Sequence, residues 1–129
     1  MEPTSPTVLL VDDDSDNREV VREFLREAGL EVWCARDGAE ALASIRVRRP
    51  DAVLLDYIMP TMDGAALARA LRESPATKDI GVVMVSGLSE AFVRPVCSDY
   101  DVFLPKPYSP DQAVQALTQA VRRRGAPAA

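Results

Sequence analysis

The sequence predicts an α/β protein whose five strands form one parallel sheet. Five short apolar runs recur along the chain, and a segment with helical spacing or helix-capping residues follows each of them. The runs show no alternation of polar and apolar residues, so both faces of the sheet should be buried. Strands that alternate with helices build right-handed βαβ units, and the strands of such units are parallel.

The first unit shows how the elements are recognised. Residues 8–11 form an apolar strand, and Asp14 or Ser15 can cap the helix that follows. Gly29 should end this helix, because glycine readily adopts the left-handed backbone of a helix C-terminus. The apolar face of the helix is expected to hold Val20, Val21, Phe24, Leu25 and Ala28.

The same signals define the rest of the chain. The remaining strands are expected at residues 31–35, 52–55, 80–85 and 102–104. Helices should follow Asp37-Gly38, Asp63-Gly64 and Ser109-Pro110, with a short one at residues 90–93 before Pro95, and the last should bury Val114, Leu117 and Val121. We expect one domain over residues 7–124, between a disordered lead at 1–6 and a disordered tail at 125–129.

The composition argues against several classes of function. A net charge of -5 disfavours nucleic acid or an anionic membrane as the main partner. The absence of histidine excludes histidine-based catalysis, histidine metal ligation and a phosphohistidine carrier. Cys34 and Cys97 form no motif and are expected as small buried residues of a reduced, cytoplasmic protein. No apolar stretch approaches a membrane span, and the first residues lack the basic start of a signal peptide.

Polar side chains stand where four of the predicted strands end. They are Asp12 and Asp13, Asp56, Ser86 and Lys106. The carboxyl ends of parallel strands share one edge of a sheet, where α/β proteins carry their chemistry. Three carboxylates gathered there would repel one another, and a hard cation such as Mg²⁺ would relieve the repulsion. Replacing Asp13 by Asn should therefore raise the melting temperature of the metal-free protein.

Asp56 is the candidate reactive group at this edge. An aspartate that only caps a helix stands directly before it, whereas a loop with Pro60 follows Asp56, and Asp63 suits the capping role better. Lys106 would supply positive charge for an anion, and Ser86 a hydroxyl donor. Taken singly, each of these residues could be a cap, a turn hydroxyl or a solvated loop lysine.

Together they resemble the receiver domain of bacterial two-component response regulators. The resemblance covers roughly residues 7–124 and is carried by four motifs: Val-Leu-Leu-Val-Asp12-Asp13-Asp14, Leu-Leu-Asp56-Tyr-Ile-Met-Pro60-Thr-Met-Asp63-Gly64, Val-Ser86-Gly87 and Phe103-Leu-Pro-Lys106-Pro107. It implies a flavodoxin-like sheet in the order 2-1-3-4-5. It also implies that Asp56 accepts a phosphoryl group from the phosphohistidine of a histidine kinase or a phosphotransfer protein.

The resemblance assigns further roles as well. Mg²⁺, for which Mn²⁺ can substitute, would lie among Asp12, Asp13, Asp56 and the carbonyl of Ile58, with Asp12 acting through water. Lys106 would pair with the phosphoryl oxygens, and the Lys106–Pro107 peptide would be cis. Ser86 would swing to the phosphoryl group while Phe103 turns inward. The domain would then be a signalling switch for an unknown downstream protein, not an enzyme.

The chain also departs from the family. The segment from Ser86 to Lys106 is slightly short, contains Pro95 and lacks the Gly-Ala pair that often precedes the fifth strand. Ile58 and Leu88 are apolar where some relatives carry groups that help water attack the acyl phosphate. These two residues predict a long-lived phosphorylated form.

Three alternatives remain open at this point. The Asp12-Asp13-Asp14 run resembles the start of a haloacid-dehalogenase-type phosphatase, although Asp16 stands where that family has Thr or Val. Asp12, Asp14, Asp16 and Glu23 have the spacing of an EF-hand calcium loop, although Asn17 replaces its glycine. The third alternative is an interaction module that never takes a phosphoryl group.

Overall fold

A computed structural model describes residues 6–58 and 64–124 of the chain. The expected Asp63 cap and the segments 1–5 and 125–129 lie outside these residues. The described chain folds, in order, as β1 (Thr7–Val11), α1 (Ser15–Glu27), β2 (Glu31–Ala35), α2 (Gly38–Val47), β3 (Ala52–Asp56), α3 (Gly64–Glu73), β4 (Gly81–Ser86), α4 (Glu90–Val93), β5 (Val102–Pro105) and α5 (Pro110–Arg124). No helix within the described ranges is long and apolar enough to span a bilayer.

The five strands pair in the order β2-β1-β3-β4-β5, and every pair is parallel. This confirms the flavodoxin-like topology. The register places Asp56 opposite Val85 and Ser86 opposite Pro105. The last residues of β3 and β4, and the loop after β5, therefore meet at one edge of the sheet.

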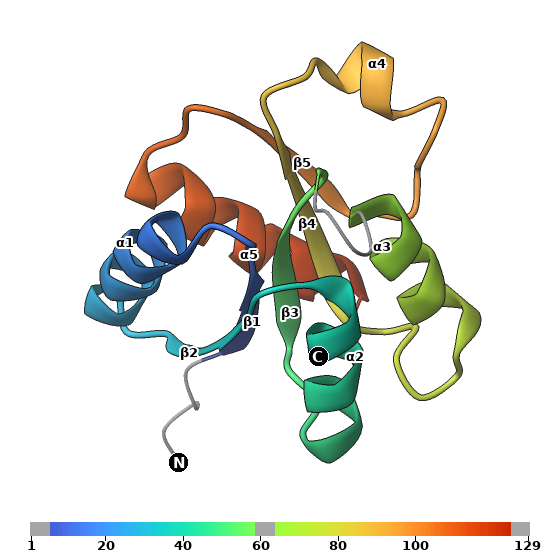
Figure 1. The fold of residues 1–129 in the computed structure, drawn as a ribbon, viewed down its shortest axis with the longest axis horizontal. Coiled ribbons are helices and arrows are strands. Elements are labelled where there is room, and N and C mark those ends of the chain that lie inside the picture. The colour runs from blue at the N-terminus through green and yellow to red at the C-terminus, as the bar shows by residue number, and fades with distance from the viewer. Residues whose placement is uncertain (1–5, 59–63, 125–129) are drawn as a thin grey trace.

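Helices cover both faces of the sheet (Figure 1). One apolar core lies toward α1 and α5 and includes Leu10, Leu25 and Leu117. The other lies toward α2 and α3 and includes Leu9 and Leu67. Adjacent residues of β1 thus point into opposite cores, which is why its sequence is apolar without alternation.

Local signals set the ends of the helices as predicted. The Asp14 side chain caps α1 by accepting from the backbone N–H groups of Asp16 at 3.0 Å and Asn17 at 3.2 Å. Gly29 follows α1 with a left-handed φ of 94°. Because α1 begins at Ser15, residues 12–23 form a capped helix and not a calcium-chelating loop, so the EF-hand alternative is wrong.

Two predictions about buried faces were only partly correct. Val20 points outward and is 63% exposed, and Ala28 is exposed as well, because α1 buries Val21 and Leu25 instead. In α5 the most buried residues are Leu117 and three alanines, Ala113, Ala116 and Ala120, whereas Val114 and Val121 are only half-buried. The reason is the close approach of α5 to β4: a Cβ added to Gly81 would lie 2.8 Å from the backbone carbon of Ala120.

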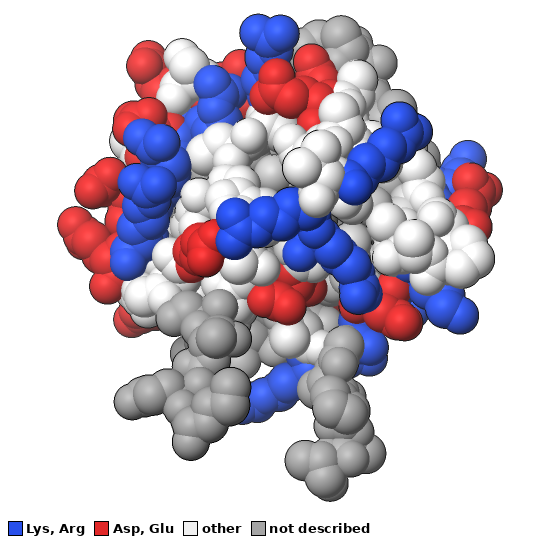
Figure 2. Space-filling model, turned by 90° about the horizontal axis from the view of Figure 1, so that it is seen from below, with Lys and Arg blue, Asp and Glu red and all other residues white. Residues whose placement is uncertain are grey.

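Basic residues gather at the edge opposite the polar strand ends. The last turns of α1, α2, α3 and α5 contain arginine, which suits the negative end of each helix dipole. In a sheet with right-handed crossovers these helix ends lie at the amino edge of the strands. Figure 2 views the molecule from below and shows Lys and Arg spread across the middle of this face.

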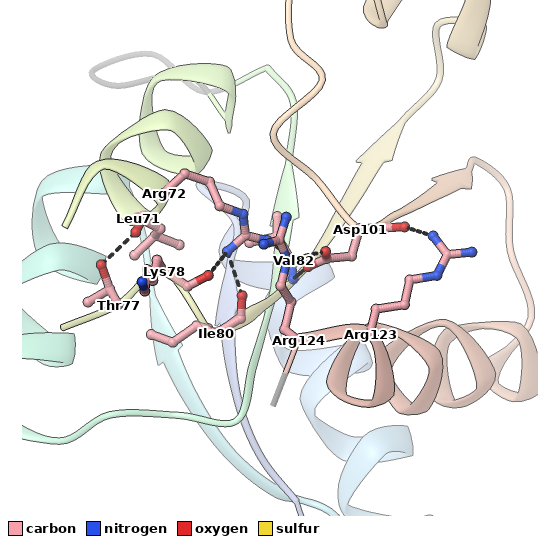
Figure 3. A network of polar contacts seen from close by, with 9 residues as sticks. All are labelled: Leu71, Arg72, Thr77, Lys78, Ile80, Val82, Asp101, Arg123 and Arg124. Carbon is pink, nitrogen blue, oxygen red and sulfur yellow. Dashed lines mark hydrogen bonds and ion pairs between the residues drawn. The ribbon is translucent and has the colours of Figure 1, made fainter. Parts of the chain in front are cut away.

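A buried polar network ties α3, β4 and α5 together (Figure 3). The Asp101 side chain is 4% exposed and accepts from Arg72 at 2.6 Å, from Arg124 at 2.6 Å and from the Val82 N–H at 2.8 Å. Arg123 donates to the backbone carbonyl of Asp101. The carboxylate is thus satisfied by three donors, as a buried charge requires.

Candidate functional site

Asp56 and Lys106 meet at the polar edge of the sheet. Asp56 ends β3 with its side chain 14% exposed, and Lys106 Nζ lies 2.7 Å from its Oδ2. The other oxygen, Oδ1, accepts from the Ile58 N–H at 3.2 Å. The Lys106–Pro107 peptide is cis, as predicted. Two residues that are 50 positions apart in the sequence therefore form an ion pair at the strand ends.

Gly64 holds the first turn of α3 against the end of β3. Its N–H donates to the Tyr57 carbonyl at 2.8 Å. A Cβ added at Gly64 would lie 2.5 Å from the Asp56 carbonyl oxygen and 2.6 Å from Leu55 Cδ1, so no larger residue fits without a backbone shift. The backbone that carries Asp56 is thereby packed closely against the first turn of α3.

Asp12 is held in place by its neighbours. It is 5% exposed, and its Oδ1 accepts from the Asp14 N–H at 3.0 Å. Its Oδ2 accepts from the side-chain amide of Asn17, while Arg18 donates to its backbone carbonyl at 2.7 Å. Asp13, by contrast, is exposed. Of these two acids after β1, only Asp12 is buried at the edge of the sheet.

A small cavity lies among these side chains. It has a volume of about 10 Å³ and is lined by Asp12, Asn17, Asp56, Lys106 and Tyr108, among others. Burial, together with the nearby charges of Asp12 and Asp56, raises the pKa of Tyr108 to about 12. The phenol therefore remains protonated beside the two carboxylates.

A larger groove adjoins this cavity. It has a volume of about 520 Å³ and is lined mainly by apolar groups, among them Val20, Phe24 and Pro107. Asn17, Lys106 and Tyr108 line it too. Asn17 and Tyr108 were not predicted as residues of the site. Their positions in the sequence could have pointed to the site, because Asn17 lies in the first helical turn after the acids and Tyr108 lies two residues after Lys106.

Comparison with known proteins agrees with this geometry. Residues 8–118 match the model of the response regulator receiver domain. The chain belongs to that family. It is 39% identical over 125 residues to the transcriptional regulatory protein PrrA of Mycobacterium tuberculosis, an alignment that covers 97% of this chain and 54% of PrrA. This receiver domain thus spans about half the length of the curated relatives it matches.

Solved structures show the same fold. A response regulator from Chloroflexus aurantiacus is 33% identical with a TM-score of 0.84, over 92% of this chain and 99% of that one. The receiver domain of the sensor histidine kinase PA1611 from Pseudomonas aeruginosa has a TM-score of 0.82 over 91% of this chain and 98% of its own. That structure has a magnesium ion coordinated in its active-site cleft, but its 24% identity supports a shared fold alone.

Ser86 and Phe103, the remaining predicted residues of the receiver domain, do not join the ion pair. Ser86 is buried, and its Oγ accepts from the Leu88 N–H at 2.9 Å. Phe103 is half-buried and packs against Tyr100, with ring centroids 5.8 Å apart. The Tyr100 hydroxyl donates to Glu90 of α4 at 2.7 Å. Tyr100 stands in the segment that lacks the usual Gly-Ala pair, and it links Phe103 to α4.

The predicted metal ligands are only partly assembled. Carboxylates and a carbonyl are the oxygen ligands that Mg²⁺ prefers, so the residue types fit. Within residues 6–58 and 64–124, however, no three acidic, histidine or cysteine side chains lie close enough to hold a metal ion. Asp56 is paired with Lys106, Asp12 is bound by Asn17, and Asp13 is exposed. The mutual repulsion expected from the sequence is therefore largely relieved by these contacts.

Proposed function

We propose that this receiver domain takes a phosphoryl group onto the Asp56 carboxylate from the phosphohistidine of a histidine kinase or a phosphotransfer protein. The observation that carries the proposal is the 2.7 Å contact of Lys106 Nζ with Asp56, beside a cavity that Asp12 also lines. A carboxylate needs no deprotonation to act as a nucleophile. Phosphoryl transfer depends mainly on positioning and charge neutralisation, which this arrangement supplies.

In the transfer, an Asp56 oxygen bonds to phosphorus while the bond from phosphorus to the donor imidazole nitrogen breaks. The imidazole leaves with the electron pair of that bond. Lys106 neutralises charge on the phosphoryl oxygens, as it now neutralises Asp56. Mg²⁺ or Mn²⁺ would be held by Asp12, Asp13, Asp56 and the Ile58 carbonyl, and when bound it supplies further positive charge. The domain acts as a switch and not as an enzyme that turns over an external substrate.

The phosphorylated state would be transmitted through Ser86 and Phe103. Ser86 would exchange its contact with Leu88 for a hydrogen bond to the phosphoryl group, and such a charge-assisted bond contributes about 1.5–3 kcal/mol. That is enough to shift a two-state equilibrium whose gap is a few kcal/mol. Phe103 would turn inward, and its contact with Tyr100 would pass the change to Glu90 and α4.

The partners follow from the surfaces beside the site. The apolar groove next to the cavity suits the docking of the phosphodonor protein. The downstream partner would bind the switched surface, while the net charge of -5 argues against nucleic acid or membrane as a ligand of this domain. Relatives such as PrrA are transcriptional regulators, so a DNA-binding role would belong to other parts of such proteins. We place the action of the domain in the cytoplasm.

Incubation with acetyl phosphate and Mg²⁺, followed by mass measurement, tests the proposal. We expect one added phosphoryl group that hydroxylamine removes, as for an acyl phosphate. Asp56→Asn should abolish it, whereas Asp51→Asn, just before the same strand, should not. A stable adduct on a serine would contradict the proposal, and no adduct at all would favour the interaction module. Turnover of p-nitrophenyl phosphate would instead favour the phosphatase alternative.

The apolar residues Ile58 and Leu88 also support a long-lived phosphorylated form. They are 63% and 37% exposed, and neither can orient a water molecule toward the acyl phosphate. A half-life of seconds, measured by the loss of the adduct after the donor is removed, would refute this part of the proposal.

A further inference from the structure

The phosphoacceptor cavity and the apolar groove share one wall. Asn17, Lys106 and Tyr108 each line both spaces. The cavity lies on the side of Asp12 and Asp56, and the groove lies on the side of Val20 and Phe24. Whatever reaches Asp56 from the groove must therefore pass these three side chains.

The cavity is narrow beside Asp56. Its volume of about 10 Å³ is close to the space that a single water molecule requires, and the Asp56 side chain is only 14% exposed. A phosphoryl group brings a phosphorus atom and three oxygens, so a donor that approaches Asp56 comes close to this wall. Asp12 and Asp56 are fixed by the ends of β1 and β3, so widening the approach falls to the shared wall.

Among the three wall residues, Tyr108 is the least restrained. Asn17 is hydrogen-bonded to Asp12, and Lys106 is paired with Asp56 at 2.7 Å. Among the described residues, the Tyr108 hydroxyl has no hydrogen-bond partner, and its ring makes an edge contact with Phe24 at a centroid distance of 6.3 Å. This contact lies on the groove side, where a docked protein would compete for the same apolar surface.

We propose that Tyr108 is a specificity-determining residue of the receiver domain, whose ring narrows the phosphoacceptor cavity and restricts small phosphodonors until a protein docked in the groove displaces it. The inference rests on the proposed function of Asp56 as phosphoacceptor. The ring, not the hydroxyl, narrows the cavity. Removing the ring should raise the rate of phosphorylation by a small donor, because the rate scales with the fraction of molecules whose cavity is open.

The test compares Tyr108→Ala, Tyr108→Leu and Tyr108→Phe with the wild type. Each protein is mixed with acetyl phosphate or phosphoramidate and Mg²⁺, and the adduct on Asp56 is followed by mass. If about a tenth of the wild-type molecules are open, Tyr108→Ala should react about tenfold faster and Tyr108→Phe at the wild-type rate. Val47→Ser changes an exposed valine of α2 that lines neither the cavity nor the groove, so it should leave the rate unchanged.

The outcomes separate the two proposals. If neither the wild type nor any variant gains a phosphoryl group, the proposed function of Asp56 fails. If all react at one rate, Asp56 is the acceptor but Tyr108 does not control access. A Tyr108→Phe rate as high as that of Tyr108→Ala would also overturn the inference, because the hydroxyl and not the ring would then be decisive. If circular dichroism shows that Tyr108→Ala is unfolded, Tyr108→Leu, which keeps apolar contact with Phe24, decides.

Discussion

Replacing Asp101 by Asn should destabilise the fold more than any change at the phosphoacceptor site. The substitution keeps the size of the side chain but removes its charge. Arg72 is 11% exposed and would then hold an unpaired buried charge. Burial lowers the pKa of Arg72, and the nearby Asp101 carboxylate acts against this shift. The stability of the charged guanidinium therefore depends on Asp101.

The magnitude follows from the burial of the pair. Removing one partner of a buried ion pair costs about 3–5 kcal/mol, whereas breaking a pair with an exposed member costs about 1 kcal/mol or less. Arg124 has a side chain that is 37% exposed. We therefore expect a loss of about 3–5 kcal/mol for Asp101→Asn and of at most about 1 kcal/mol for Arg124→Met. The first corresponds to a fall of about 10–20 °C in melting temperature.

Urea unfolding followed by circular dichroism measures both values. Asp79→Asn removes an exposed carboxylate near the same edge and serves as the matched control, with a change within about 0.5 kcal/mol. The reasoning is refuted if Asp101→Asn costs less than about 1 kcal/mol, the value expected of a solvated pair. Equal losses for Asp101→Asn and Arg124→Met would likewise show that Arg72 does not need its partner.

Three further predictions concern the phosphoacceptor site. Lys106→Met should slow phosphorylation of Asp56 yet change the free energy of unfolding by at most about 1 kcal/mol, since the lysine side chain is 39% exposed; a larger loss in urea unfolding would contradict this. Asp13→Asn should stay within about 0.5 kcal/mol of the wild type in EDTA because Asp13 is exposed, but calorimetry should show that it loses the Mg²⁺-dependent gain, about 2.7 kcal/mol at a hundredfold excess over Kd. An unchanged Mg²⁺ response would remove Asp13 from the site. The folded pKa of Tyr108, about 12, exceeds its unfolded value of 10.0, so the folded state binds more protons and stability should fall as the pH rises between these values. After allowance for the partial exposure of Tyr108, the free energy of unfolding should fall by about 1–2 kcal/mol. Urea unfolding at pH values on both sides of this range should show the fall in the wild type but not in Tyr108→Phe.

Signals that lie close together in the sequence predicted most of the fold. The caps Asp14 and Asp37 and the stop at Gly29 depend on the backbone of a few neighbouring residues. The meeting of Asp56 with Lys106 was predictable for a different reason, since both follow strands of one parallel sheet. The strand ends alone were sufficient to bring these two residues together.

The missed features depend on how the helices are rotated and packed. Val20 points outward because of the angle at which α1 lies on the sheet. The helical spacing of apolar residues in the sequence does not determine that angle. Asn17 and Tyr108 meet at the cavity because α1 packs beside the loop after β5, a contact between distant parts of the chain. Asp101 belongs to no motif in the sequence, and only the fold brings two arginines from α3 and α5 to it.

The Asp101 network also determines how the domain would respond to mechanical force. A pull on the carboxyl end of α5 would act first on Arg123 and Arg124, which are bonded to Asp101 just before β5 (Figure 3). Asp101 transmits that load to β4 through the Val82 N–H and to α3 through Arg72. The helix therefore cannot peel away one turn at a time, because its end is anchored to the middle of the molecule. In a single-molecule pulling experiment, α5 and the sheet should yield in one step.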